Sequence, residues 1–235
     1  MLPIHDNVPH RRPPVVTVAL IAANTGVFIF QLMLPEAMHE KLLYLFGVVP
    51  ARFTHPRWAA WVGFPADNYW PFLTSQFLHG GLFHLIMNMW TLWLFGDNVE
   101  DRMGHGRFLI FYLICGALSG VGHTLVNSRS TIPAIGASGA IAGVMGAYFL
   151  LYPLARLVVL VPVFFYPLFF EIPAFFYLFF WFVMQLFSGT ASILAPGAGG
   201  GIAWWAHVGG FAAGAALCGL FVRRRPRRRI ATDPW

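Results

Sequence analysis

The chain has 235 residues, of which 58% are apolar and only 10% are charged, and its formal net charge is +6. Because soluble domains carry about 25% charged residues, this chain has too few charges to cover a water-facing surface of its size. Its apolar residues occur in blocks long enough to cross a bilayer, which excludes a soluble protein and predicts one membrane domain at 15–222.

The first predicted elements are a tail, a span and a long loop. Residues 1–14 are polar and proline-rich, and we interpret them as a cytoplasmic tail. The apolar block at 15–34 is long enough to remain as a span rather than be cleaved as a signal peptide. The loop at 35–81 combines scattered charges with many aromatic residues, which is typical of a segment at the level of the lipid headgroups.

Five further apolar segments complete a prediction of six spans. They cover residues 82–95, 108–126, 135–154, 172–187 and 202–222. The stretch 157–187 is too long for one span and short for two, and its first half contains prolines, so we expect an apolar loop before the fifth span. The predicted fold class is an all-α membrane protein, a bundle of six transmembrane helices with a long interfacial first loop.

Six spans place both termini on the same side of the membrane. The tail at 223–235 contains six arginines, and Arg11 and Arg12 precede the first span. By the positive-inside rule both termini are cytoplasmic, and we expect the protein in a bacterial inner membrane. A basic tail directly after a span is better explained by contact with anionic lipid headgroups than by nucleic-acid binding. Membrane lipid, and not nucleic acid, is therefore an expected partner.

Three polar motifs lie near the outer ends of the second, fourth and sixth spans. They are His84 with Asn88 four residues later, Gly136-Ala137-Ser138-Gly139, and Ala206-His207-Val208-Gly209-Gly210. Taken singly, each has an ordinary explanation as a helix-packing serine, a satisfied histidine or an interhelical polar contact. All three spans run from outside to inside, so at ~1.5 Å per residue the three motifs share a shallow depth. This shared depth indicates one site.

The residue types of this site suit acyl transfer. A serine hydroxyl cannot attack an amide unaided, and His207 could take the Ser138 proton and return it to the leaving amine. Small residues along both spans allow the close approach that the short serine side chain needs. His84 and Asn88 could donate hydrogen bonds to a developing oxyanion. The sequence places no carboxylate at this depth, so we predict a Ser138–His207 dyad rather than a triad.

Together these motifs resemble the rhomboid family of intramembrane serine proteases over roughly residues 70–222. The matching residues are the Gly-x-Ser-Gly of 136–139, the His-Val-Gly-Gly of 207–210, Gly214, the His84-x-x-x-Asn88 pair and Glu100-x-Arg102. The resemblance implies a rhomboid-like bundle that cuts transmembrane proteins near the outer membrane face. It implies Ser138 as nucleophile, His207 as base, and His84 and Asn88 as oxyanion donors. It also implies supporting positions at Gly136, Gly139, His79, Gly210 and Gly214.

The chain departs from the family at one position beside the site. Some members place a tyrosine one turn after the serine, stacked on the catalytic histidine, and here that position is Ala142. Another group must therefore hold His207, and an aromatic residue of the fifth span is a candidate. That span is rich in large rings, and we predict that it forms a lateral gate with the glycine-rich loop at 197–201, with Phe176 and Trp181 facing inward. The alternative is that these rings simply face lipid.

Three other functions compete with a protease. A catalytically silent, client-binding rhomboid-like protein would lack the serine or the histidine, and both are present. A transporter would need paired buried carboxylates for ion coupling, which the predicted spans lack. A zinc enzyme is disfavoured because the five-residue spacing of His79 and His84 does not align two ligands on one helix face. We expect no metal or other cofactor, and the oligomeric state is left open.

Overall fold

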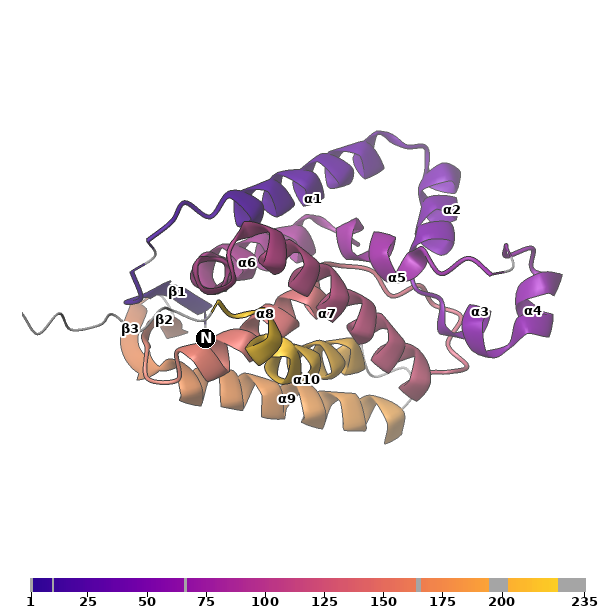
Figure 1. The fold of residues 1–235 in the computed structure, drawn as a ribbon. Coiled ribbons are helices and arrows are strands. Elements are labelled where there is room, and N and C mark those ends of the chain that lie inside the picture. Colours follow the sequence, from indigo (N-terminus) through magenta and orange to yellow (C-terminus); the bar gives the residue numbers. More distant parts are fainter. Residues whose placement is uncertain (1, 10, 66, 164–165, 195–202, 224–235) are drawn as a thin grey trace, which may run out of the picture.

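Figure 1 shows the computed structural model of the chain, which describes residues 2–9, 11–65, 67–163, 166–194 and 203–223. Helices account for most of these residues, and a small sheet lies at one end of the helical bundle. The loop at 197–201, predicted as part of a gate, lies outside the described residues, as does the basic tail beyond Arg223.

Four helices are long and apolar enough to cross a membrane: α1 (Val15–Met33), α7 (His105–Val126), α9 (Ala174–Leu194) and α10 (Trp204–Phe221). Each coincides with a predicted span, so the prediction of a helical membrane bundle is confirmed. The two remaining predicted spans correspond to α6 (Leu82–Met103) and α8 (Ser138–Leu151). Charged residues in the last turns of α6 and the 14-residue length of α8 distinguish these two helices from the other four.

The long loop between α1 and α6 is built from short helices. They are α2 (Glu36–Phe46), α3 (Pro50–Thr54), α4 (Pro56–Trp61), α5 (Pro71–Thr74) and the 3-10 turn η1 (Ser75–Phe77). A proline stands in the first turn of α3, α4 and α5, where its fixed φ favours helix initiation and its missing N–H has no cost. Trp61, Tyr69 and Trp70 project from this loop with most of their surface exposed, as expected at the level of lipid headgroups.

The helix α8 forms the centre of the bundle. Its residues from Gly139 to Tyr148 are all buried, and it packs against α6, α7 and above all α10. Glycines make the contact with α10 close. A Cβ atom on Gly214 would collide with the carbonyl oxygen of Gly143, and one on Gly143 would collide with Cβ of Cys115 on α7. The small residues of α8 and α10 therefore bring backbone against backbone, which is how membrane helices associate without a hydrophobic driving force.

The all-α prediction is wrong at one end of the bundle, where three strands form an antiparallel sheet in the order β1-β2-β3. The strands are β1 (Leu2–Asp6), β2 (Arg156–Val163) and β3 (Tyr166–Pro173). The region predicted as an apolar loop is thus a strand pair, in register from Arg156 opposite Pro173 to Val163 opposite Tyr166. Its prolines disfavour a helix, while its β-branched and aromatic residues favour strands.

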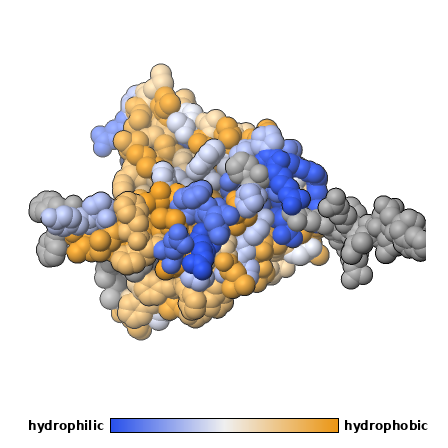
Figure 2. Space-filling model, turned by 90° about the vertical axis from the view of Figure 1, so that its left-hand side faces the viewer, coloured by the Kyte–Doolittle hydropathy of each residue, from blue (hydrophilic) through white to orange (hydrophobic). Residues whose placement is uncertain are grey.

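Part of the segment interpreted as an N-terminal tail is structured, because residues 2–6 form β1, which pairs with β2 and contacts α6. The Asp6 carboxylate is buried and accepts hydrogen bonds from the Tyr148 hydroxyl at 2.6 Å and from Asn98 Nδ2 at 2.9 Å. The indole N–H of Trp90 donates to the Pro3 carbonyl at 2.7 Å. Figure 2 views the molecule from this end, where hydrophilic residues gather near the middle and apolar residues surround them.

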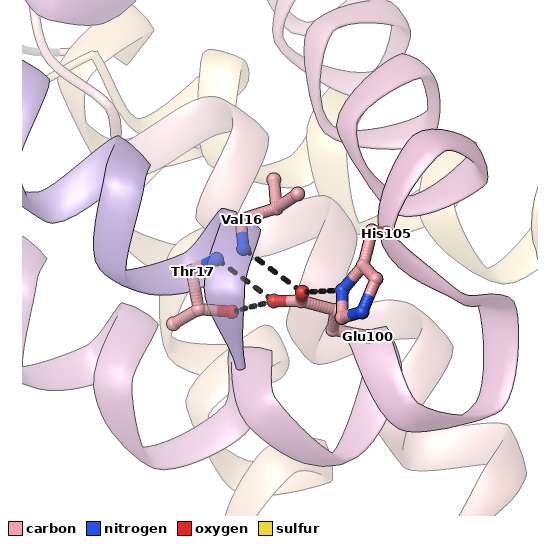
Figure 3. A network of polar contacts seen from close by, with 4 residues as sticks. All are labelled: Val16, Thr17, Glu100 and His105. Carbon is pink, nitrogen blue, oxygen red and sulfur yellow. Dashed lines mark hydrogen bonds and ion pairs between the residues drawn. The ribbon is translucent and has the colours of Figure 1, made fainter. Parts of the chain in front are cut away.

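A buried carboxylate joins three helices at the same end of the bundle (Figure 3). Glu100 of α6 accepts hydrogen bonds from the backbone N–H groups of Val16 and Thr17 at 2.9 and 2.8 Å, and from the Thr17 hydroxyl at 2.7 Å. Its other contact is His105 Nδ1 on α7, at 2.5 Å. These N–H groups lie in the first turn of α1 and have no acceptor within the helix. A negative charge at this helix end is therefore stabilised by hydrogen bonds and by the helix dipole. Glu100 therefore fixes the start of α1 against α6 and α7.

Candidate active site

Ser138 begins α8, and the turn before it depends on a glycine. Gly136 has φ +120, a conformation that side chains other than hydrogen rarely permit. A Cβ atom there would also lie 2.7 Å from His84 Cε1 and 2.8 Å from His84 Nε2. The turn is held by a hydrogen bond from the Gly136 N–H to the Ser75 carbonyl at 2.9 Å. Gly136 therefore lets the His84 ring lie directly against the chain that presents Ser138.

His207 lies in the first turns of α10 and faces the serine. Its Nε2 atom is 2.9 Å from Ser138 Oγ, within hydrogen-bonding distance. This approach depends on the glycines below it, because a Cβ atom on Gly210 would collide with the Gly139 carbonyl oxygen. A Cβ atom on Gly139 would in turn collide with Ser119 Oγ on α7. The structure thus brings the two predicted dyad residues together, and Gly139, Gly210 and Gly214 have close-packing roles.

The other ring nitrogen of His207 also has a partner. His207 Nδ1 lies 2.8 Å from Oε1 of Gln185, which comes from α9. The rings of Trp181 and Trp204 flank the imidazole with centroids at 6.0 and 6.2 Å. An aromatic residue of the fifth span was expected to hold His207, and Trp181 is nearby, but the direct hydrogen bond comes from Gln185. The sequence carried one signal for it, a single amide within a run of large apolar side chains.

His84 and Asn88 of α6 line the same open cavity as the dyad. The cavity has a volume of about 820 Å³, and Ser138, His207, His84 and Asn88 all line it. Trp181 and Gln185 line its α9 side. Asn88 is 7% exposed, and its Nδ2 atom has no hydrogen-bond partner among the described residues. A buried amide N–H without a partner is costly, so a hydrogen bond to an oxygen atom that enters the cavity would be favourable.

His79 is fully buried behind His84. Its backbone N–H donates to Gln31 Oε1 at 3.0 Å, and Gln31 Nε2 donates to the His79 carbonyl at 3.1 Å, which ties this loop to α1. The two imidazoles meet edge to face with centroids 5.2 Å apart. Burial, and then the neighbouring His84, lower the pKa of His79 to about 4, so the ring is neutral near pH 7. This position suits the supporting role that the sequence predicted.

The fifth-span rings predicted to face inward differ in position. Trp181 lines the cavity, whereas Phe176 is 62% exposed and packs against Phe175 on the outer face of α9. The prediction for Phe176 is therefore wrong, because the two residues are five apart and lie on different faces of the helix. Among the residues that the structure describes, no three His, Cys, Asp or Glu side chains are arranged to hold a metal ion.

A family model, the Rhomboid domain, matches residues 66–224 of the chain. The chain belongs to the rhomboid family. Rhomboid protease GluP of Bacillus subtilis (strain 168) is 43% identical over 80 residues, which are 34% of this chain and 15% of that protein. Putative rhomboid protease YdcA of the same strain is 32% identical over 114 residues, 46% of this chain and 56% of that protein.

A mitochondrial relative is similar over a comparable length. Presenilin-associated rhomboid-like protein of Homo sapiens is 35% identical over 94 residues, 38% of this chain and 24% of that protein. The chain therefore matches between 15% and 56% of the length of these three relatives. Membership of the rhomboid family, together with four helices of spanning length and apolarity, identifies an integral membrane protein.

The rhomboid match includes every residue of the candidate site. It also includes the departure noted at Ala142, which is fully buried and offers no ring to His207. In this rhomboid the polar contact to the imidazole comes instead from Gln185 on α9.

Proposed function

We propose that this rhomboid is an intramembrane serine endopeptidase that hydrolyses peptide bonds of transmembrane proteins near the outer membrane face. The observation that carries the proposal is the 2.9 Å contact between His207 Nε2 and Ser138 Oγ at the wall of an open cavity. A serine protease requires a nucleophile and a base within hydrogen-bonding distance, and here the pair lies beside an open cavity.

The proposed reaction has two halves. His207 Nε2 takes the proton of Ser138 Oγ while Oγ attacks the scissile carbonyl carbon, and it then gives that proton to the leaving amine. The substrate's new C-terminal end is now an ester on Ser138. A water molecule attacks this ester with His207 again as the base, and Ser138 recovers its proton. The dyad therefore returns to its starting state after each cleavage.

The carbonyl oxygen becomes an anion in both halves and needs donors. His84 and Asn88 line the same cavity as Ser138, and the N–H of Ser138 is at the N-terminal end of α8, where it has no partner within the helix. Asn88 Nδ2, which has no partner among the described residues, is the donor most ready for this task. Donors fixed before the reaction stabilise the anion by roughly 2.7–4 kcal/mol each.

We also propose six spans, with α6 and α8 added to the four longer apolar helices. The 14 residues of α8 span about 21 Å, less than the ~30 Å of a bilayer core. A helix this short leaves Ser138 below the membrane surface when its inner end reaches the other face. The cavity would then supply water to a buried site. Both termini are proposed to be cytoplasmic, in a bacterial inner membrane, with a membrane domain at 15–222 and a basic tail at 223–235.

Reconstitution tests the proposal. Purified protein in lipid vesicles is incubated with a panel of single-span model proteins, and the cut sites are mapped by mass spectrometry. We expect cleavage within or beside the outer part of the substrate span, absent with Ser138→Ala. Binding of the same substrates without any cleavage would favour the alternative function, a catalytically silent client-binding protein.

A further inference from the structure

Gln185 occupies an unusual place for a polar side chain in a membrane helix. It is 6% exposed, and its carboxamide lies between its own helix and the imidazole of His207. Nε2 of the amide donates to the Trp181 carbonyl at 3.3 Å, one turn earlier in α9. This contact uses the NH2 end of the amide, so the carbonyl end, Oε1, is the one that faces His207 Nδ1 at 2.8 Å.

The orientation of the amide determines the protonation of the ring. An amide oxygen only accepts hydrogen bonds, so His207 Nδ1 must carry the proton that is shared with Gln185. In a neutral imidazole the other nitrogen, Nε2, then has a free lone pair. That lone pair is directed at Ser138 Oγ, 2.9 Å away. Only this tautomer can accept the serine proton, so the α9 contact selects the form of His207 that is competent as a base.

Other polar side chains of α9 have no comparable role. Thr190 Oγ1 bonds to the Leu186 carbonyl and Ser192 Oγ bonds to the Gly189 carbonyl, both within the helix. Within the described part of α9, Gln185 is the residue whose side chain bonds to a side chain of another helix. A polar group buried among lipid-facing rings is costly without a partner, and here the partner is the candidate base.

We propose that Gln185 is the positioning residue for His207, an inference that rests on the proposed Ser138–His207 chemistry. It holds the tautomer and ring orientation that an aspartate holds in Ser-His-Asp triads. A neutral amide suits this location, because a buried carboxylate would carry a large desolvation cost in an apolar helix bundle. The amide does not supply a full negative charge, so it orients the base more than it stabilises the imidazolium.

Two substitutions separate positioning from packing. Gln185→Met keeps the length of the side chain and removes the acceptor. Gln185→Glu keeps an acceptor oxygen and adds a titratable charge. The matched control is Thr190→Val, which removes an intrahelical hydrogen bond from an exposed position of the same helix. Each variant is reconstituted in vesicles, and kcat, KM, the pH profile of cleavage and the rate of Ser138 labelling by a fluorophosphonate are measured.

We expect Gln185→Met to lower kcat by roughly 10–100-fold, as for a misplaced catalytic group, with KM little changed. Labelling of Ser138 slows in parallel, because the probe needs the same base. Gln185→Glu recovers much of the rate, and its pH profile differs from the wild type, since a carboxylate beside His207 stabilises the imidazolium and moves the acid limb to higher pH. Thr190→Val behaves as the wild type in all four measurements.

A Gln185→Met protein with wild-type kcat and labelling rate would overturn the inference. If this variant does not fold, as judged by its melting temperature, the Gln185→Glu profile decides, and a profile identical to the wild type overturns it. Failure of the proposed function gives a different result, because the wild type itself would then show no cleavage that depends on Ser138. A requirement for Ser138 without any effect at Gln185 removes this inference alone.

Discussion

Gly210 of α10 lies so close to Gly139 of α8 that a Cβ atom on Gly210 would collide with the Gly139 carbonyl oxygen. The contact lies one turn below the pair formed by Ser138 and His207, so the separation of the two helices sets the distance between the serine oxygen and the imidazole. The dyad partners are 69 positions apart in the chain, so this distance is a property of helix packing rather than of local chain geometry.

Gly210→Ala is therefore expected to reduce both stability and activity. The added methyl group meets backbone atoms, which cannot rotate away, and overpacking of this kind costs about 1–3 kcal/mol. The matched control is Gly219→Ala on the same helix, where a Cβ atom would meet nothing within 4 Å. Thermal melting and cleavage are measured for both variants in one detergent. Equal behaviour of the two would show that the α8–α10 contact does not set the dyad distance.

Removal of either dyad residue is expected to abolish cleavage without unfolding the protein. Ser138→Ala loses one hydroxyl, and His207→Ala is nearly as inactive because nucleophile and base act as a unit. A fluorophosphonate should label the wild type at Ser138 alone, detected by peptide mapping. EDTA should leave cleavage unchanged. Labelling that persists in Ser138→Ala, or activity lost with EDTA and restored by zinc, contradicts the dyad.

His84→Ala and Asn88→Ala are each expected to lower kcat by roughly 10–1000-fold with a smaller change in KM, because an oxyanion donor acts mainly in the transition state. Steady-state kinetics on a fixed substrate measure both parameters. Ile86→Ala provides the control, since Ile86 lies on the same helix and is 51% exposed. A rise in KM at constant kcat would instead indicate that His84 and Asn88 dock the substrate.

Trp181→Ala tests the lateral gate. The Trp181 ring lines the cavity on the α9 side, whereas the Phe176 ring lies on the exposed face of the same helix. Removal of the Trp181 ring is expected to raise the ratio of transmembrane-substrate cleavage to soluble-peptide cleavage. If loss of the ring also disturbs His207, the cleavage of both substrates slows and the ratio is unaffected. Phe176→Ala should leave the ratio unchanged. An unchanged ratio in Trp181→Ala removes this part of α9 from the entry route.

Glu100→Gln is expected to destabilise the fold. The carboxylate accepts three hydrogen bonds from Val16 and Thr17, one at Oε1 and two at Oε2, whereas a glutamine has one acceptor oxygen and its NH2 end would face the donors at the other position. Groups left unpaired in a buried site cost about 1–3 kcal/mol each. Glu40→Gln on the exposed face of α2 makes the same charge change without these contacts. Melting temperatures that fall equally in both variants would assign the effect to net charge alone.

The helical spans and the convergence of the four site residues could be predicted from the sequence, because both depend on local patterns. Long apolar runs define spans, and equal distances from the span starts place His84, Ser138 and His207 at one depth. The helix α6 extends to Met103, beyond the apolar segment predicted at 82–95, and Asn98 in its last turns bonds to Asp6 and Tyr152, which lie far away in the chain.

The sheet and Gln185 could not be predicted for a shared reason, which is that both depend on partners far away in the chain. A short apolar segment such as 156–173 has the same composition whether it forms strands or loop, and β1 pairs with β2 across roughly 150 residues. In the sequence, Gln185 is a single amide within an aromatic span. Its role becomes visible only in the fold, where α9 lies beside α10 and Gln185 Oε1 is 2.8 Å from His207 Nδ1.

The pairing of β1 with β2 also constrains the order in which this protein can assemble. The partner strand of residues 2–6 begins at Arg156, so it is synthesised after α1, α6, α7 and α8. Asn98 and Tyr148, which donate hydrogen bonds to Asp6, are also made long after it. The strand β1 can therefore join the sheet only after these helices have been made. Closure of the sheet is a late step of biogenesis, and a bulky group inserted just before β1 would interfere with this step rather than with the entry of helices into the membrane.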